Sequence, residues 1–193
     1  MDKTFFRNQV LDTLNSMDRT LHEKCSLYIT ERLLASEEFR NAETIGITIS
    51  RFPEINTRQI IETAWEMGKR IAVPKCIHAT REMDFRLIQS YKQLETVYLD
   101  LMEPIVDETT SVRKNEIDLQ IVPGVVFSDE GYRIGFGGGY YDRYMMDYEG
   151  YAVSLAFECQ TGHPVPVERH DIPVSKLVTE KREILCGAPE RKS

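Results

Sequence analysis

The segment IDLQIVPGVVFSDEGYRIGFGGGYYDR, residues 117–143, is the most informative part of the 193-residue sequence. Residues 117–122 form an apolar run that is interrupted by one Asp and one Gln, which is typical of a buried strand, and residues 125–127 continue extended. A polar turn then leads to four glycines within the five positions 135–139 and to a helix predicted to end near Met146. This order of strand, glycine loop and helix indicates an α/β protein.

Helical and strand-like patterns alternate outward from this segment. Two amphipathic helices open the chain, with apolar stripes from Phe5 to Leu14 and from Leu21 to Leu33. Thr57 is predicted to cap a helix over 58–67 that stops at Gly68. The predicted strands are 44–49, 71–73 (ended by Pro74), 83–88, 151–157 and 176–179, and residues 89–115 are predicted to be loop with short elements.

Composition limits the class of protein. The formal net charge of -7 and the sequence pI near 5.2 argue against nucleic acid as a partner, because a phosphate backbone requires a basic face. No apolar run approaches the roughly 20 residues that span a bilayer, and no secretory signal opens the chain, so a cytoplasmic protein with no membrane partner is expected. The four widely spaced cysteines predict reduced thiols in or near the core. We expect one domain over residues 1–193.

The glycine loop is suited to binding phosphate. Glycines allow successive backbone N–H groups to converge, and the following helix N-terminus adds partial positive charge. Arg133 and Arg143 would add positive charge at its two ends. The alternative is a flexible turn with no ligand. The loop is neither a Walker motif, since no Lys-Ser/Thr follows it, nor a dinucleotide fingerprint, since Tyr140 stands where glycine is required.

Asp142 and the two tyrosines before it also admit two interpretations. A carboxylate in the first turn of a helix needs no function, but beside a phosphate site it is the hard oxygen ligand that magnesium requires. Consecutive residues on a helix cannot both face the core, so at least one of Tyr140 and Tyr141 is expected to face a cleft.

Residues 121–127 and 131–143 closely resemble the signature of the 5-formyltetrahydrofolate cyclo-ligase family. Further segments of the chain resemble the family as well, namely 3–7, 53–57, 68–74, 170–174 and 178–180. The resemblance implies a three-layer α/β/α sandwich with a mixed, largely parallel sheet. It also implies the conversion of 5-formyltetrahydrofolate, possibly polyglutamylated, and ATP into 5,10-methenyltetrahydrofolate, ADP and phosphate, with Mg²⁺ and without a protein nucleophile.

The resemblance also implies roles for individual residues. Arg133 and Tyr140 would act in the reaction, and Asp142 and Asp171 would hold magnesium. ATP would be bound by Lys3, Arg7, Arg133, Ile134, Gly135, Phe136, Gly137, Gly138, Gly139, Tyr140 and Tyr141. The folate site would be lined by Ile49, Glu54, Phe136, Gly137, Gly138, Gly139 and Tyr140.

These roles have alternatives. Lys3 and Arg7, one helical turn apart, could form a solvated face, and Glu54 and Asp171 could be ordinary loop acids. The family commonly has a second acid where this chain has Ser175, which makes the metal geometry there uncertain. Two other functions remain open: a non-catalytic folate- or nucleotide-binding regulator on the same fold, and a phosphosugar isomerase or acyl transferase of similar architecture. A monomer is expected.

Overall fold

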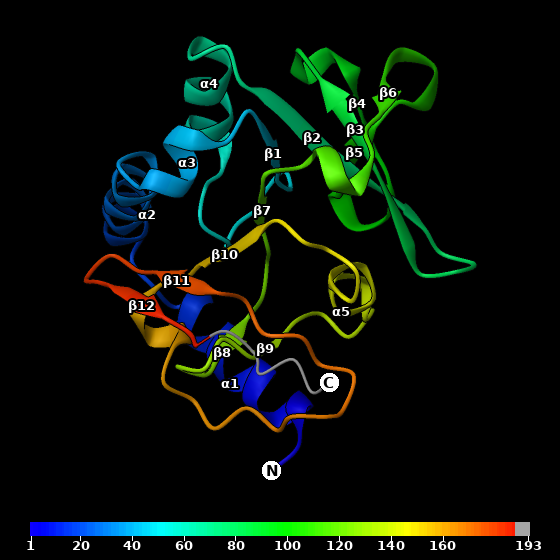
Figure 1. The fold of residues 1–193 in the computed structure, drawn as a ribbon. Coiled ribbons are helices and arrows are strands. Elements are labelled where there is room, and N and C mark those ends of the chain that lie inside the picture. The colour runs from blue at the N-terminus through cyan, green and yellow to red at the C-terminus, as the bar shows by residue number, and fades with distance from the viewer. Residues whose placement is uncertain (188–193) are drawn as a thin grey trace.

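The computed structural model describes residues 1–187 and contains one eight-stranded sheet in the order β12-β11-β10-β7-β1-β2-β3-β6 (Figure 1). The five strands from β11 to β2 run parallel, whereas β12, β3 and β6 pair antiparallel with their neighbours. The bounds are β1 Thr44–Gly46, β2 Arg70–Ile77, β3 Glu82–Ile88, β6 Thr110–Ser111, β7 Leu119–Ile121, β10 Tyr151–Leu155, β11 Lys176–Val178 and β12 Glu183–Leu185. The mixed, largely parallel sheet is therefore confirmed.

Within residues 1–187, five α-helices and two small hairpins complete the fold. The helices are α1 Lys3–Asn15, α2 Arg19–Leu34, α3 Glu37–Asn41, α4 Arg58–Glu66 and α5 Tyr140–Met145. The hairpins pair β4 Leu94–Thr96 with β5 Met102–Pro104, and β8 Val126–Phe127 with β9 Arg133–Ile134. Short 3-10 turns are η1 Tyr91–Gln93, η2 Tyr98–Asp100, η3 Val106–Glu108, η4 Lys114–Glu116 and η5 Glu158–Gln160.

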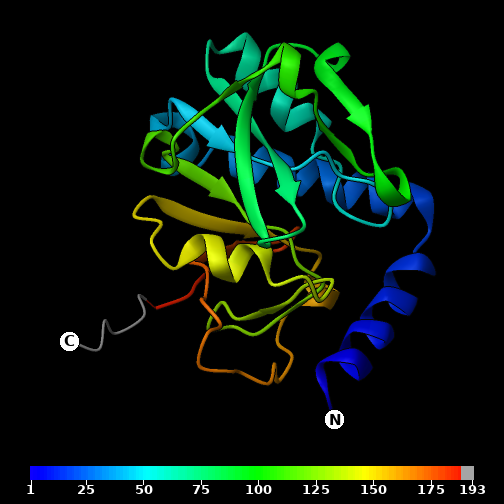
Figure 2. The ribbon, with the colours of Figure 1, turned by 90° about the vertical axis from the view of Figure 1, so that its right-hand side faces the viewer.

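Two apolar clusters lie on opposite faces of the sheet, because successive side chains of a strand point to opposite sides. Along β2, Ile71 and Val73 belong to the cluster that α1, α2 and α4 cover, and Ala72 belongs to the other cluster. Tyr144 and Met145 of α5 join that second cluster, and Figure 2 shows α5 on one side of the sheet with α2 on the other. The predicted α/β/α arrangement follows from this alternation.

One sequence prediction about local structure is wrong, and another is met only in part. Pro74 does not end its strand: β2 continues to Ile77, because β1 stops opposite Ala72 and leaves no neighbour on that side to require the missing N–H. Thr57 is the N-cap residue of α4, as predicted, but its side chain makes no capping hydrogen bond. Its hydroxyl instead donates to the Thr48 carbonyl and accepts from the Ser50 amide, at 2.9 and 3.1 Å.

Other local predictions are partly met. The strand expected over 44–49 is assigned only as β1, although Ile47 still donates to Ala72 of β2. Strand β12 is absent from the sequence prediction. All four thiols are free, but Cys159 is exposed, unlike the other three. The predicted domain includes residues 188–193, which lie outside the described part of the chain. Within the described part, no helix is long and apolar enough to cross a bilayer.

Candidate active site

The first helix brings two cations to a region encoded more than a hundred residues later. The Lys3 ammonium lies 2.9 Å from Oδ2 of Asp171, and Arg7 Nε donates to the Gly135 carbonyl at 2.6 Å. Helix α1 packs beside β8 (Figure 1). From it Arg7 reaches the glycine loop that follows the β8–β9 hairpin, and Lys3 reaches the 168–174 loop. Long-range contacts of this kind require a fixed position of α1, which a merely solvated helix face would not have.

The glycine loop presents its main chain to solvent. Gly137 and Gly139 have φ of +96° and +70°, in the left-handed region that side chains rarely adopt. Phe136, Gly137 and Gly139 are exposed, so the backbone groups between them are accessible to a ligand. Glycine is therefore required at Gly137 and Gly139 by backbone conformation rather than by lack of space.

The tip of the β2–β3 hairpin also contacts this loop. Arg81 donates from Nη1 to the Gly138 carbonyl at 2.7 Å, and His78 Nδ1 lies 2.8 Å from the Tyr140 hydroxyl. Sequence analysis did not identify His78 or Arg81, because a short polar turn between two strands carries no signal for a partner about 60 positions away. Both residues are exposed and lie beside the accessible face of the loop.

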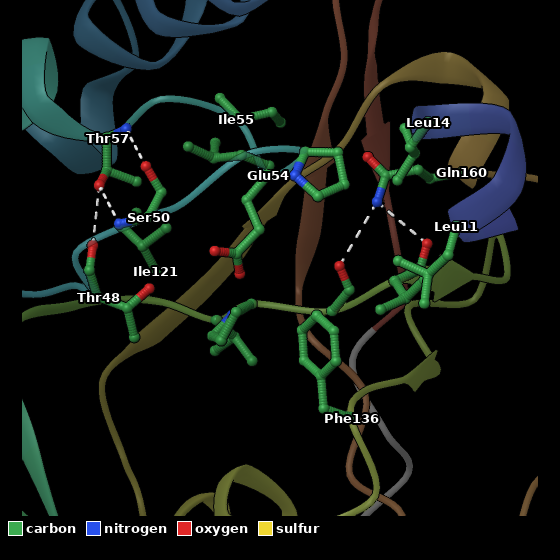
Figure 3. Close-up of a pocket in the computed structure, with 16 residues that line it drawn as sticks. Leu11, Leu14, Thr48, Ser50, Glu54, Ile55, Thr57, Ile121, Phe136 and Gln160 are labelled. Carbon is green, nitrogen blue, oxygen red and sulfur yellow. Dashed lines mark hydrogen bonds between the residues drawn. The ribbon is translucent and has the colours of Figure 1, made fainter. Parts of the chain in front are cut away.

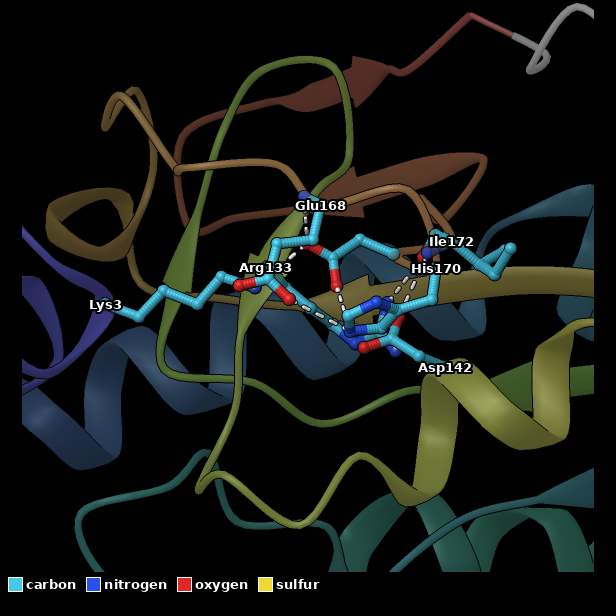
Figure 4. Close-up of polar contacts among 7 residues, drawn as sticks. Lys3, Arg133, Asp142, Glu168, His170 and Ile172 are labelled. Carbon is cyan, nitrogen blue, oxygen red and sulfur yellow. Dashed lines mark hydrogen bonds and ion pairs between the residues drawn. The ribbon is translucent and has the colours of Figure 1, made fainter.

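Arg133 is buried beneath the loop. Its side chain is 4% exposed, and its guanidinium donates to the Ile172 carbonyl at 2.7 Å and pairs with Oδ1 of Asp142 at 3.1 Å (Figure 4). The same Asp142 oxygen accepts from the Ile172 amide at 3.0 Å. Burial lowers the pKa of Arg133, and the charges of Asp142, Tyr141 and Asp171 oppose this effect. Arg133 thus joins α5 to the 168–174 loop.

Three potential metal ligands gather in that loop. One ligand atom each from Glu168, His170 and Asp171 lie within 4.8 Å of one another. Burial alone would raise the pKa of Asp171, but the Glu168 amide and the Lys3 ammonium hold this pKa below its usual value. Oδ2 of Asp171 accepts both of these bonds. An ionised carboxylate held in this way is a suitable oxygen donor for magnesium.

Asp142 also fits a metal by its chemistry. Its Oδ1 takes the contacts with Arg133 and Ile172, and within residues 1–187 no hydrogen bond engages Oδ2. Ser175 uses its backbone to pair with Ala152 and Cys186, and it does not belong to the Glu168, His170 and Asp171 group. The presence of Ser175 where the family commonly has an acid therefore leaves the three clustered ligands in place.

A narrow apolar cavity lies beside the loop, around the carboxylate of Glu54 (Figure 3). Leu11 and Leu14 of α1 line one side, and Phe136 of the glycine loop closes another. Oε2 of Glu54 accepts from the Arg51 amide at 2.9 Å, and burial raises the pKa of Glu54 even though this bond and the Arg51 charge oppose the shift. The cavity, of about 50 Å³, offers one half-buried acid within mostly apolar walls.

Comparisons with known proteins identify the family of the chain. The sequence profile of the 5-formyltetrahydrofolate cyclo-ligase family matches residues 1–180. The chain belongs to this family. It is 32% identical over 146 residues to the Escherichia coli K12 5-formyltetrahydrofolate cyclo-ligase, covering 73% of this chain and 80% of that protein. It is 26% identical over 191 residues to the mouse enzyme, covering 92% and 93%.

Solved structures of similar proteins have the same fold. The Aquifex aeolicus 5,10-methenyltetrahydrofolate synthetase superposes with a TM-score of 0.85 and 27% identity over the whole of both chains. The Mycoplasma pneumoniae 5,10-methenyltetrahydrofolate synthetase gives a TM-score of 0.75 at 23% identity and covers 93% of this chain and 99% of its own. The fold predicted from the cyclo-ligase signature is thereby confirmed, and the chain is an enzyme of that family.

The structure brings most of the residues predicted from the cyclo-ligase signature together. Lys3, Arg7 and residues 133–142 form one continuous region with Asp171. Two of the predicted residues, Ile49 and Arg133, are buried instead. Ile49 is buried in the core and is not part of the Glu54 cavity, because the neighbouring Thr48 and Ser50 point there instead. Arg133 is too buried to stand at the rim of the loop as a free charge.

The two tyrosines of the cyclo-ligase signature separate as the helical pattern requires. The hydroxyl of Tyr140 points outward to His78, whereas Tyr141 packs against the cluster under α5. The buried Tyr141 hydroxyl has no hydrogen-bond partner among the described residues, and burial raises the pKa of this phenol far above its usual range. Tyr140 is therefore the tyrosine that a ligand in the loop can reach.

Proposed function

We propose that the chain converts 5-formyltetrahydrofolate and ATP into 5,10-methenyltetrahydrofolate, ADP and phosphate with magnesium. Family membership supports the folate ligase chemistry. The requirement for ATP is supported by one observation above all: Arg7 contacts the glycine loop at the Gly135 carbonyl, and Lys3, one turn earlier on α1, is paired with Asp171 in the adjoining 168–174 loop. Two cations beside accessible N–H groups are suited to binding the phosphates of a nucleotide.

The chemistry explains why a nucleotide is required. A formyl group on nitrogen is an amide, and its oxygen is a poor leaving group. In the proposed route the formyl oxygen attacks the γ-phosphorus of ATP, and ADP leaves. The neighbouring N10 amine then forms a bond to the formyl carbon and loses its proton, and phosphate departs with the former formyl oxygen. This sequence needs positioning and charge neutralisation rather than a protein nucleophile.

The phosphate side of the site would use residues from three elements. Lys3 and Arg7 are in reach of phosphate oxygens once they exchange their present partners, Asp171 and the Gly135 carbonyl. Arg133 does not contact the nucleotide in this proposal; it positions Asp142. Magnesium, when bound by Asp142 and Asp171, supplies neutralisation of phosphate charge.

The folate side would use the cavity around Glu54. A half-buried carboxylate between mostly apolar walls can accept hydrogen bonds from the N–H groups of the pteridine ring, while the walls contact the faces of the ring. The cavity of about 50 Å³ is too narrow for a bicyclic ring as it stands. Phe136 is 60% exposed on the glycine loop, so its displacement is the simplest way to admit the ring. Tyr140 would then face the reacting formyl group.

An absorbance assay tests the proposal. Methenyltetrahydrofolate absorbs in the near ultraviolet, so we expect absorbance to grow when enzyme, 5-formyltetrahydrofolate, ATP and magnesium are combined, with one phosphate released per product. Omitting ATP or adding a chelator should abolish the signal. Growth without ATP, or none with all components present, would contradict the proposal; the second result would favour the regulator among the alternatives.

A further inference from the structure

The β2–β3 hairpin is an arm that extends beyond the parallel part of the sheet (Figure 1). Strand β1 ends at Gly46, opposite Ala72 of β2, whereas β2 continues to Ile77 and stays paired with β3 up to Glu82. Antiparallel pairing over this whole length fixes the two strands relative to each other. The position of the hairpin tip is therefore set by the strands and not by a free loop.

The tip of this arm is attached to the glycine loop and to the helix that follows it. Arg81 donates from Nη1 to the Gly138 carbonyl at 2.7 Å, and His78 Nδ1 lies 2.8 Å from the Tyr140 hydroxyl. Arg81 has a φ of +58°, in the left-handed region that a residue with a side chain rarely adopts. Such a conformation persists only where surrounding contacts favour it, and the bond to Gly138 is one of these contacts.

The guanidinium of Arg81 has donors left for an anion. Within residues 1–187 only its Nη1 makes a hydrogen bond, and no carboxylate of this range lies within ion-pair distance of Arg81. The carboxylate of the next residue, Glu82, accepts from the Thr80 hydroxyl instead. Because a guanidinium offers five N–H donors in one plane, Nε and Nη2 can bind a phosphate while Nη1 keeps its bond to Gly138.

The main chain of the glycine loop is arranged in the same sense. Its carbonyl groups at Gly135 and Gly138 accept from two guanidinium groups, Arg7 of α1 and Arg81 of the hairpin. No backbone carbonyl of residues 1–187 accepts from the amides of residues 135–139. The loop therefore offers N–H groups between two arginines, a combination that suits the oxygens of a phosphate group.

We propose that Arg81 binds the terminal phosphoryl group of ATP and keeps this contact while the group is transferred to the formyl oxygen. The inference rests on the proposed function, in which Tyr140 faces the formyl group. The hairpin tip contacts that tyrosine, so Arg81 approaches the loop from the side of the acceptor, whereas Arg7 approaches from α1. An arginine in this position neutralises negative charge on the group in transfer.

Binding of ATP and ADP to Arg81→Ala tests the contact without requiring turnover. In calorimetry with magnesium and without folate, we expect Kd for ATP to rise about tenfold, as for loss of a charged hydrogen bond. Kd for ADP, which lacks the terminal group, should stay close to the wild-type value. Arg81→Lys should recover part of the affinity for ATP. His78→Ala is the matched control, because it removes the other attachment of the tip and keeps the guanidinium; both of its affinities should match the wild type.

Turnover gives a second readout. At saturating ATP, kcat of Arg81→Ala in the absorbance assay should fall by about 10², as for loss of one donor to a developing charge. Added guanidinium ion should restore part of this kcat, which the loss of a purely structural contact would not allow. A normal kcat would overturn the part of Arg81 in the transfer.

The affinities separate the failure of this contact from the failure of the proposed reaction. Unchanged affinity for ATP in Arg81→Ala, or an equal loss of affinity for ATP and ADP, would overturn the contact and leave the reaction of an active wild type unaffected. A wild type that forms no methenyltetrahydrofolate, with a selective loss of ATP affinity in Arg81→Ala, would refute the reaction and leave the contact supported. A wild type that binds no ATP would overturn both.

Discussion

The phosphate side of the site and the surface between α2 and residues 50–59 differ in how their cations are partnered. At the glycine loop, Arg133 and Lys3 are ion-paired with Asp142 and Asp171 inside the protein. Between α2 and residues 50–59, Arg19 and Arg58 stack on the rings of Phe52 and Tyr91. Neither forms an ion pair with a carboxylate of residues 1–187. The first arrangement joins separate segments of the chain and contributes to the stability of the fold, whereas the second does not depend on an acid partner. Substitutions in the two regions should therefore affect different quantities.

Asp142→Ala should have the largest effect. It would leave the buried Arg133 guanidinium without its acid, so the free energy of unfolding should fall by about 3 kcal/mol, and turnover should fall by about 10² to 10³. Urea unfolding and the absorbance assay measure the two effects. Asp147→Ala is the control, since its pair with Lys114 is at the surface and should contribute less than about 1 kcal/mol. Near-normal stability and turnover in Asp142→Ala would mean that the paired cluster has no such role.

Glu54→Gln should reduce activity while increasing stability. The folded state binds the proton of Glu54 more tightly than the unfolded chain, because its pKa is raised. Stability therefore falls as pH rises from the ordinary value of 4.5 through the raised pKa, and the neutral amide of the Glu54→Gln variant removes this loss. We expect a higher urea midpoint than wild type at neutral pH, and a loss of folate affinity of about 10².

The difference in stability between variant and wild type, measured at two pH values, provides the check for Glu54→Gln. Well below pH 4.5 the wild-type carboxyl is protonated in both states, so the two proteins should have similar stability there. If the Glu54→Gln variant is less stable than wild type at neutral pH, the ionised Glu54 carboxylate does not destabilise the fold. If its folate affinity is unchanged, the carboxylate does not bind the substrate.

Lys3→Met should have a smaller effect on stability and a clear effect on acid unfolding. The pKa of Asp171 is lowered, so its contribution is present above the ordinary value of 3.8 and is lost as pH falls through the folded pKa. Removing Lys3 raises this pKa, and acid unfolding should begin at a higher pH. At neutral pH we expect a loss of about 1 kcal/mol and a rise of about tenfold in KM for ATP. Lys24→Met, on the exposed side of α2, is the control.

His78→Ala should have the smallest effect. The contact with Tyr140 is exposed, so the free energy of unfolding should change by less than about 0.5 kcal/mol. Tyr140→Phe removes the hydroxyl on the other side of the same contact and should be equally stable. If Tyr140 faces the formyl group, its variant alone should lose about tenfold in turnover. Equal turnover of both variants would assign Tyr140 no part in the reaction.

The sequence predicted the elements of the fold well because their signals are local. The apolar stripes of α1 and α2 and the glycine run before α5 each identify an element within a few residues. Pro74 was misjudged because its effect depends on whether a strand lies beside it, which is a property of the assembled sheet. Thr57 was placed correctly at the start of α4, but the missing side-chain cap has the same origin, since its hydroxyl bonds to Thr48 and Ser50 rather than to its own helix.

The sequence could predict the site residues that belong to a motif. It could not predict residues that come together only in the folded chain. Lys3, Arg7 and Asp142 were identified through the resemblance, and the structure then showed which charges pair. The burial of Arg133 could not be deduced from its place beside a glycine loop. Arg19, Arg51 and Arg58 come from two separate segments without a common pattern, so only the folded chain shows that they line one hollow.

The attachment of α1 has a consequence for synthesis of the protein on the ribosome. Lys3 is translated 168 residues before Asp171, and Arg7 is translated 128 residues before Gly135. At a typical rate of about 5 to 20 residues per second, the first helix waits on the order of ten seconds for these partners. During that time its apolar stripe is without its final cover, which makes the emerging N-terminal segment a natural client for a chaperone.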